Sequence, residues 1–262
     1  MRILFLFFIN AFMAISAAAS ISNNAPAERP IEIHQRIMRD DVGSNLGSPA
    51  PPTASPIAPP IAALTLDACG GQYDADLIRL LVAHHVPATI FITKKWIDRN
   101  PAGLRDLLAH PELFELENHG AEHIPAVIGA HRRVYGILGE PDIAHLHHEV
   151  EGAAVDIRAL THRSVNWYRG ATAEYDRAAI EEIEKMGYRI AGFSVNADAG
   201  ATLKRRTIAD RLFHITDGDI IIAHMNKPRG DTAEGIGDAL PTLLARGFQF
   251  VTLNNVRVHE IR

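Results

Sequence analysis

Apolar stretches with two different periods alternate along the chain from residue 61 to residue 254. Short apolar runs of strand length are followed by stretches in which apolar residues recur every three or four positions, the spacing of an amphipathic helix. The short runs predict strands at 61–67, 87–93, 113–118, 164–169, 188–196, 219–225 and 248–254. The longer stretches predict helices at 75–85, 100–110, 143–161, 174–187, 208–215 and 234–247.

This regular alternation predicts an α/β fold, because parallel strands need crossover helices to connect them. We expect a single domain over residues 61–262, built on about seven parallel strands. Such a set of strands can close into a barrel or remain an open sheet, and the hydrophobic pattern fits both arrangements.

The N-terminal part of the chain has a different character. Residues 1–19 contain one arginine, a long apolar run and a final Ala17-Ala18-Ala19, a pattern that predicts a secretory signal peptide. An uncleaved membrane anchor is the alternative. Residues 20–60 are rich in Pro, Ala, Ser and Asn, which predicts an extended or disordered segment that tethers or wraps the domain. We therefore expect an exported protein, periplasmic or secreted, without stable membrane insertion after cleavage.

Composition narrows the possible partners. The 262-residue chain has a formal net charge of −5 and no basic block, which argues against a nucleic-acid partner. Cys69 is the only cysteine, so the chain has no internal disulfide. Its stability must come from the hydrophobic core, to which a bound metal can add.

Ionisable side chains stand where the predicted strands end. Five strand ends carry a carboxylate, an imidazole or a guanidinium, namely Asp67, His119, Arg169, Asp198 and His224. In a parallel β/α fold the carboxyl ends of the strands share one rim, so these groups are expected to lie together. A purely structural protein has no reason to place charges where apolar strands stop, because each charge would need a desolvated partner.

His119 and His123 lie four positions apart in the stretch ENHGAEHIP. If the segment after the strand makes one helical turn, both imidazoles face the same point. Two neutral imidazoles at that spacing suit a zinc-like cation. Two unrelated surface histidines are the alternative, and the position of His119 at a strand end distinguishes it from the histidines of HHVP and HLHH, which lie within predicted helices.

Five stretches of the chain resemble, in order, the motifs of the polysaccharide deacetylases, carbohydrate esterase family 4, in a subgroup with a TLDACGG first motif. They are TLDACGG (65–71), NHGAEH (118–123), WYRGATAEYD (167–176), NADAG (196–200) and IIAHMN (221–226). The resemblance covers roughly residues 61–255. It implies a distorted (β/α) barrel and a metal-dependent hydrolase that removes N-acetyl or O-acetyl groups from a cell-envelope or extracellular polysaccharide, with an acetylated glycan as substrate.

The resemblance also implies catalytic roles. Asp67 is expected to be the base that takes a proton from water, and Arg169 is expected to hold it ionised. His224 is expected to be the acid that protonates the leaving amine, and Asp198 to stabilise its imidazolium.

For the metal, the resemblance implies His119 and His123 as ligands of a divalent cation, with Zn²⁺ as the preferred ion. The family's first motif has a second aspartate that binds the metal, and Ala68 stands at that place here. A catalytic cation usually has a third protein ligand. Asp74 is the candidate, with capping of the next helix as the alternative, and Cys69 is a weaker candidate.

Four residues of the third and fifth motifs are candidates for substrate binding: Trp167, Tyr168, Met225 and Asn226. Aromatic rings can stack on sugar faces, although core packing is the more common fate of such residues. Two other functions stay open. The replacement at Ala68 fits a catalytically silent carbohydrate-binding relative, and the scarcity of exposed-looking aromatic residues fits a deacetylase or amidase of a small, non-polymeric substrate.

Overall fold

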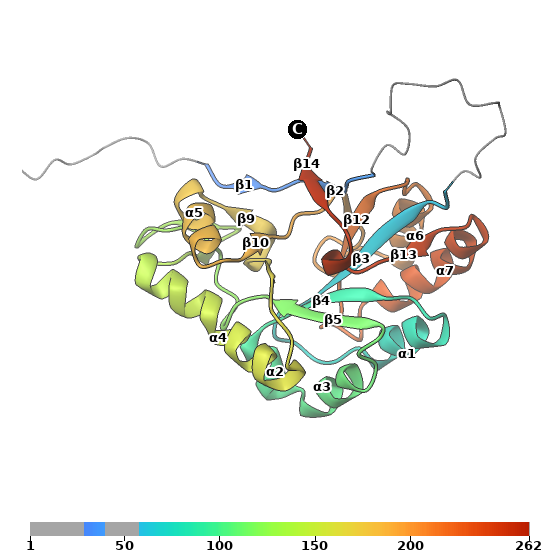
Figure 1. The fold of residues 1–262 in the computed structure, drawn as a ribbon, viewed down its shortest axis with the longest axis horizontal. Helices are drawn as coiled ribbons and strands as arrows, with labels where there is room; N and C mark the ends of the chain where they lie inside the picture. The colour runs from blue at the N-terminus through green and yellow to red at the C-terminus, as the bar shows by residue number, and fades with distance from the viewer. Residues whose placement is uncertain (1–28, 40–57, 262) are drawn as a thin grey trace, which may run out of the picture.

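The computed structural model describes residues 29–39 and 58–261 (Figure 1). The predicted signal peptide at 1–19 lies outside the described residues. None of the helices in the described residues is both long enough and apolar enough to cross a membrane.

A curled, mostly parallel sheet with the strand order β10-β8-β5-β4-β3-β12-β2-β14 forms the centre of the fold (Figure 1). Its parallel members are β3 (Ile61–Ala68), β4 (Ala88–Ile92), β5 (Phe114–Asn118), β8 (Trp167–Tyr168), β10 (Arg189–Ile190) and β12 (Asp219–His224). Two further parallel strands pair beside this path, β11 (Val195–Asn196) with β12 and β13 (Gln249–Phe250) with β3. At one edge, β2 (Gln35–Ile37) lies antiparallel between β12 and β14 (Val258–Glu260). The predicted single-domain α/β fold with a distorted barrel is confirmed.

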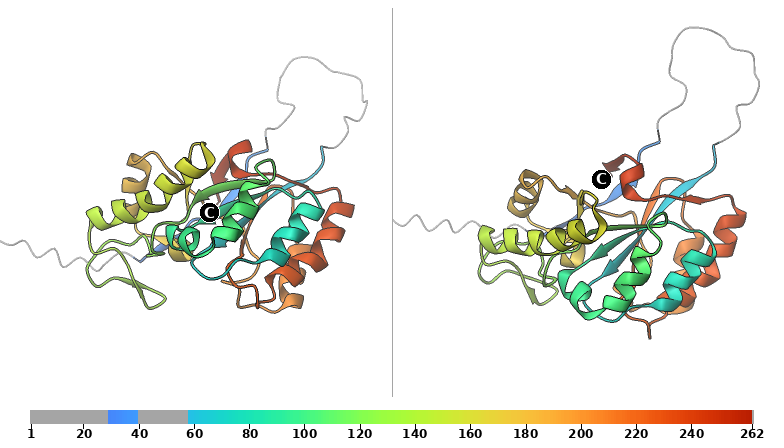
Figure 2. Two further views of the ribbon diagram at one scale, coloured as in Figure 1. Left: turned by 90° about the horizontal axis from the view of Figure 1, so that it is seen from below. Right: turned by 60° about the horizontal axis from the view of Figure 1, so that its bottom comes forward.

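Helices surround the outer side of the curled sheet (Figures 1 and 2). They are α1 (Ala75–Ala83), α2 (Lys94–Arg99), α3 (Pro101–Leu108), α4 (Ile143–Thr161), α5 (Arg177–Lys185), α6 (Arg205–Phe213) and α7 (Thr232–Ala245), with 3₁₀ turns η1 (Ala171–Ala173) and η2 (Leu253–Asn255). Two small antiparallel pairs complete the elements, β1 (Ile31–Glu32) with β9 (Glu174–Tyr175) and β6 (Arg133–Val134) with β7 (Ile137–Leu138).

The period of two along each strand sorts side chains between the two faces of the sheet. On β3, Leu64 and Leu66 pack in the main core beneath the helices. Their neighbours Thr65 and Asp67 therefore point to the inner face, where a second apolar cluster contains Phe91 of β4 and other inward residues. This alternation brings the polar residues at the strand ends into the interior of the half-barrel.

The segment 29–39 lies within residues 20–60, where an extended or disordered segment that tethers or wraps the domain was expected, and it pairs with the domain as β1 and β2. It also explains why the predicted strand at 188–196 divides into β10 and β11. Phe193 O accepts the Gln35 N–H at 3.0 Å, and a Cβ on Gly192 would lie 2.2 Å from Ile33 O. The crossing segment thus takes the place of a strand neighbour there.

Candidate active site

Asp67 and Arg169 form a buried ion pair at the carboxyl ends of β3 and β8. Arg169 Nη1 donates to Asp67 Oδ1 at 2.9 Å and to Thr65 Oγ1 at 2.8 Å. The other guanidinium nitrogens donate to the carbonyl oxygens of Ala191 and Gly192. Since every edge of the guanidinium is bonded, Arg169 holds the Asp67 carboxylate in a fixed orientation.

The charges around Asp67 keep it ionised. Burial would raise the pKa of this carboxyl, but the Arg169 guanidinium and the nearby His119 and His224 outweigh burial and lower the pKa below the ordinary 3.8. Its second oxygen, Oδ2, lies 3.8 Å from His119 Nε2. A buried carboxylate that stays charged at neutral pH is suited to accept a proton.

His224 and Asp198 form a second ionisable pair on the neighbouring strand ends. His224 Nδ1 lies 2.8 Å from Asp198 Oδ1, and Asp198 Oδ2 accepts the His224 backbone N–H and the Thr232 hydroxyl. Burial would lower the pKa of His224, but Asp198 and the Cys69 thiol raise it well above the ordinary 6.5. His224 and Asp67 are register partners on β12 and β3, so the two ionisable pairs lie beside each other.

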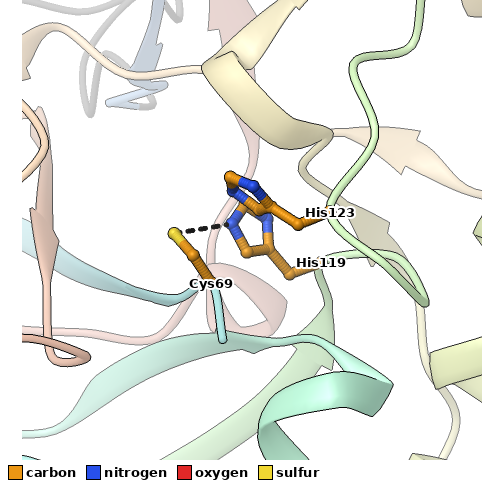
Figure 3. Close-up of side chains that lie close together, drawn as sticks. All are labelled: Cys69, His119 and His123. Carbon is orange, nitrogen blue, oxygen red and sulfur yellow. Dashed lines mark hydrogen bonds between the residues drawn. The ribbon is translucent and has the colours of Figure 1, made fainter. Parts of the chain in front are cut away.

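Cys69, His119 and His123 form the third group of the site (Figure 3). One ligand atom from each lies within 4.8 Å of the others, and the two imidazole centroids are 4.9 Å apart. Cys69 Sγ is 3.4 Å from His119 Nε2. Burial would raise the pKa of the Cys69 thiol, but the imidazoles of His119, His123 and His224 lower it well below its ordinary value.

The protonation of His119 is set by its hydrogen bond to the backbone. Its Nδ1 lies 2.6 Å from the carbonyl oxygen of Arg169, which can only accept, so Nδ1 carries the proton. The lone pair of the neutral ring is therefore on Nε2, the atom that faces Cys69. This is the arrangement that metal-binding histidines in proteins usually show.

These three side chains fit a divalent cation of zinc type. Thiolate sulfur and imidazole nitrogen are the preferred ligands of zinc, and ligand atoms around tetrahedral zinc are roughly 3.3–3.8 Å apart. The 3.4 Å separation of Cys69 Sγ and His119 Nε2 falls in this range. With three protein ligands, one position would remain open for water or substrate.

The two imidazoles converge by a different route from the expected helical turn. Residues 119–125 form an irregular loop after β5, without helical hydrogen bonding. Gly120 and His123 both have left-handed backbone conformations, with φ of 84° and 66°. These two residues reverse the chain so that His123 turns back over His119.

The expectation of Asp74 as third ligand is wrong in this structure. The Asp74 carboxylate caps α1 by accepting the Leu77 N–H at 3.0 Å, which is the alternative role considered for it. Among the described residues, the potential metal-binding group contains Cys69 in its place. The reason is the chain path after β3, because Cys69 directly follows the strand, whereas the Gly70-Gly71 turn leads Asp74 to the start of the helix.

Asp67, His224 and the potential metal ligands line one cavity of about 480 Å³. Its lining also includes residues that the sequence did not single out, among them Glu32 of β1, Tyr135 of the β6–β7 hairpin, Thr172 and Lys227. Asn226, a predicted substrate-binding residue, lines the same cavity, and its Oδ1 has no hydrogen-bond partner within the described structure.

The other three predicted substrate-binding residues do not reach the cavity. Trp167 packs in the inner apolar cluster with the Arg189 guanidinium 3.8 Å from its ring. Tyr168 and Met225 are fully buried in the main core. Trp167 faces inward below Arg169, and Tyr168 faces outward, as the alternation along β8 requires. These three assignments are corrected to core packing.

Comparison with known proteins identifies the family of the chain. The family model described as polysaccharide deacetylase matches residues 55–191. The chain belongs to this family. No curated protein matches the chain in sequence.

Several solved structures of the deacetylase family share the fold. The peptidoglycan deacetylase PdaC from Bacillus subtilis is 19% identical, with a TM-score of 0.60 over 76% of this chain and 90% of that one. A family 4 acetyl xylan esterase from Clostridium thermocellum, in complex with a cobalt ion, is 19% identical, with a TM-score of 0.60 over 74% and 89%. The Bacillus anthracis protein BA3943, described as a CE4 family pseudoenzyme, is 16% identical, with a TM-score of 0.60 over 76% and 66%.

Proposed function

We propose that this polysaccharide deacetylase family member is an active, metal-dependent hydrolase that removes acetyl groups from an acetylated glycan outside the cytoplasm. The observation that carries the proposal is the convergence of an ionised carboxylate, a protonated imidazole and a Cys/His/His group around one cavity. The predicted signal peptide supports an exported location, periplasmic or secreted.

Cys69, His119 and His123 would hold the cation, with Zn²⁺ as the proposed ion. A thiolate ligand favours zinc over hard cations such as Mg²⁺ and Ca²⁺, which prefer oxygen. When bound, the cation supplies Lewis acidity toward the acetyl carbonyl oxygen. Cys69 thereby compensates for the alanine at position 68, where the family's first motif has its second aspartate.

Asp67 acts as the general base in this mechanism. Its Oδ1 is bonded to Arg169, which leaves Oδ2 facing the cavity as the proton acceptor. Water attacks the acetyl carbon as Asp67 takes one of its protons. Because Arg169 and the neighbouring imidazoles lower the pKa of Asp67, the carboxylate is ready to accept at neutral pH.

His224 acts as the general acid. It is protonated over a wide pH range because Asp198 raises its pKa. As the bond between the acetyl carbon and the sugar nitrogen breaks, His224 gives its proton to the departing amine, and acetate is released. For an O-acetyl substrate the same proton would go to the departing alkoxide.

A catalytically silent relative is the main rival, because BA3943 is described as a pseudoenzyme. The presence of Cys69 beside the two histidines favours an active enzyme. Hydrolysis of a small, non-polymeric substrate is the second rival function. The limited cavity volume of about 480 Å³ is compatible with such a substrate.

Acetate release from a panel of acetylated glycans tests the proposal. Acetylated chito-oligosaccharides, peptidoglycan, acetylated xylan and N-acetylglucosamine monomer would be incubated with the Zn²⁺-loaded protein, with and without chelator. We expect release from an oligomer that the chelator abolishes. The double variant H119A/H123A should contain no zinc by elemental analysis. Absence of release from every substrate, with zinc bound, would favour the silent relative, and release from the monomer alone would favour the small substrate.

A further inference from the structure

The loop that carries His123 needs external support. His123 has a φ of 66°, a left-handed conformation that costs a residue with a side chain on the order of 1 kcal/mol or more. The loop has no helical hydrogen bonds of its own to fix it. The orientation of the His123 imidazole therefore depends on what binds the backbone on either side of it.

Glu149 of α4 binds the backbone on both sides of His123. Its Oε2 accepts the Glu122 N–H at 2.8 Å, and its Oε1 accepts the Ile124 N–H at 3.0 Å. Its own carbonyl oxygen accepts the Ala121 N–H at 2.8 Å. Glu149 is only 2% exposed, so water does not compete for these bonds.

The packing around Glu149 allows this close approach. A Cβ on Gly120 would lie 2.3 Å from Glu149 Oε1, and a Cβ on Gly152 would lie 2.6 Å from the Ala121 side chain. On the other side of the loop, the N–H groups of Lys94 and Lys95 at the start of α2 donate to the carbonyl oxygens of Gly120 and Ala121. The loop is thus held between α2 and α4. Its carbonyl groups accept from the start of α2, and its N–H groups donate to Glu149 of α4.

We propose that Glu149 is a positioning residue that directs His123 toward Cys69 and His119 and thereby sets the affinity of the group for its metal. The proposal rests on the proposed function in one respect, that these three side chains bind a divalent cation. It extends that function to a residue of α4 that belongs to none of the five sequence motifs and does not line the cavity.

The chemistry requires a carboxylate at this position. Both side-chain oxygens of Glu149 accept a backbone N–H, and a glutamine could offer only one acceptor. The side-chain NH2 of the glutamine would then face one of the two backbone N–H groups, and two donors cannot form a hydrogen bond with each other. Removal of the side chain would leave two buried N–H groups without partners, and the loop could relax out of its left-handed conformation.

The decisive measurement is Zn²⁺ affinity of the metal-stripped full-length protein, obtained by competition with a chromogenic chelator. We expect E149A to bind Zn²⁺ about 10–100-fold more weakly than the wild type, and E149Q to lie between them. The Co²⁺-loaded E149A protein should also show altered ligand-field bands, because His123 is no longer held in place. A purely structural role would lower the thermal midpoint of the metal-free protein without changing either readout.

Glu151 provides the matched control two residues away on the same helix. It binds Arg158 and Tyr188 and makes no contact with the loop among its hydrogen bonds. E151A should therefore keep wild-type Zn²⁺ affinity. If E149A does not fold, E149D, which is one methylene shorter, tests the same contacts and should also weaken binding.

Wild-type affinity in E149A, or an equal loss in E151A, would overturn the inference while leaving the deacetylase proposal intact. Weakened binding in E149A would support the inference even if no glycan released acetate, so the two failures are distinguishable. A wild-type protein that binds no Zn²⁺ would overturn the inference together with the metal assignment.

Discussion

Two carboxylates on the inner face of the half-barrel behave in opposite ways. Asp67 at the end of β3 is bonded to a guanidinium and lies near two imidazoles, and these charges lower its pKa despite burial. Glu117 on β5 accepts the N–H groups of Asn166 and Trp167 and a side-chain bond from Asn254, all of them neutral donors. Burial then dominates and raises the pKa of Glu117 to about 7.

The difference separates the carboxylate that we propose as the base from a structural one. Both groups are buried, so burial does not distinguish them, and Glu117 accepts more hydrogen bonds than Asp67 does. The charge of the partners distinguishes them, because the cationic Arg169 and the nearby imidazoles offset the cost of burying Asp67, and the neutral donors at Glu117 do not offset burial there. Glu117 ties the start of β8 to the segment around η2, whereas Asp67 faces the cavity.

The largest expected effect is on turnover and comes from replacing the proposed base, Asp67. D67N should lower kcat on acetylated glycan by a factor on the order of 100 or more, because an amide cannot take the proton from water. Zn²⁺ content should stay close to that of the wild type, since Asp67 is not among Cys69, His119 and His123. Near-normal turnover in D67N would remove it from the role of base.

An intermediate effect is expected at the second charged pair. D198N takes away the carboxylate that contributes most to raising the pKa of His224, so this pKa should fall. The alkaline limb of the pH–rate profile should move to lower pH, and kcat at pH 8 should fall by about tenfold or more. The profile of kcat against pH from 5 to 10 checks this, and an unmoved alkaline limb would contradict the assignment of His224 as acid.

The last prediction concerns stability, not turnover, and the structural carboxylate Glu117. The folded-state pKa of Glu117 is about 7 and its ordinary value is 4.5, so the folded state binds more protons between these values. Wild-type stability should therefore fall relative to E117Q as pH rises from about 4.5 to 7, by at most about 3 kcal/mol. Urea unfolding of both proteins at pH 5 and pH 8 measures the difference. Parallel stability curves would show that Glu117 stays ionised.

Much of the site could be predicted from strand ends. Asp67, His119 and Arg169 each follow an apolar strand, and the period of two places each on the same face as its inward neighbours. The fold class followed from the same pattern of strands and helices. Boundaries were less predictable between β10 and β11, where Phe193 pairs with the 29–39 segment, because that pairing depends on tertiary structure.

The parts that sequence reasoning missed depend on the path of loops. Asp74 and Cys69 are both polar residues after β3, and only the turn at Gly70-Gly71 determines which of them remains at the site. Glu149 lies in a stretch with ordinary helical spacing, and nothing in that spacing reveals three bonds to a loop. Trp167 and Tyr168 looked available for sugar stacking because exposure cannot be read from residue type.

The position of β2 has a practical consequence for anyone preparing shorter versions of this protein. Family similarity begins at residue 55, yet β2 at Gln35–Ile37 fills the place between β12 and β14, and Glu32 just before it helps to wall the cavity. A chain trimmed to the family boundary would expose the edge of β12 near Asp219 and leave β14 without its partner strand, which would invite self-association there. Expression should therefore start upstream of residue 29.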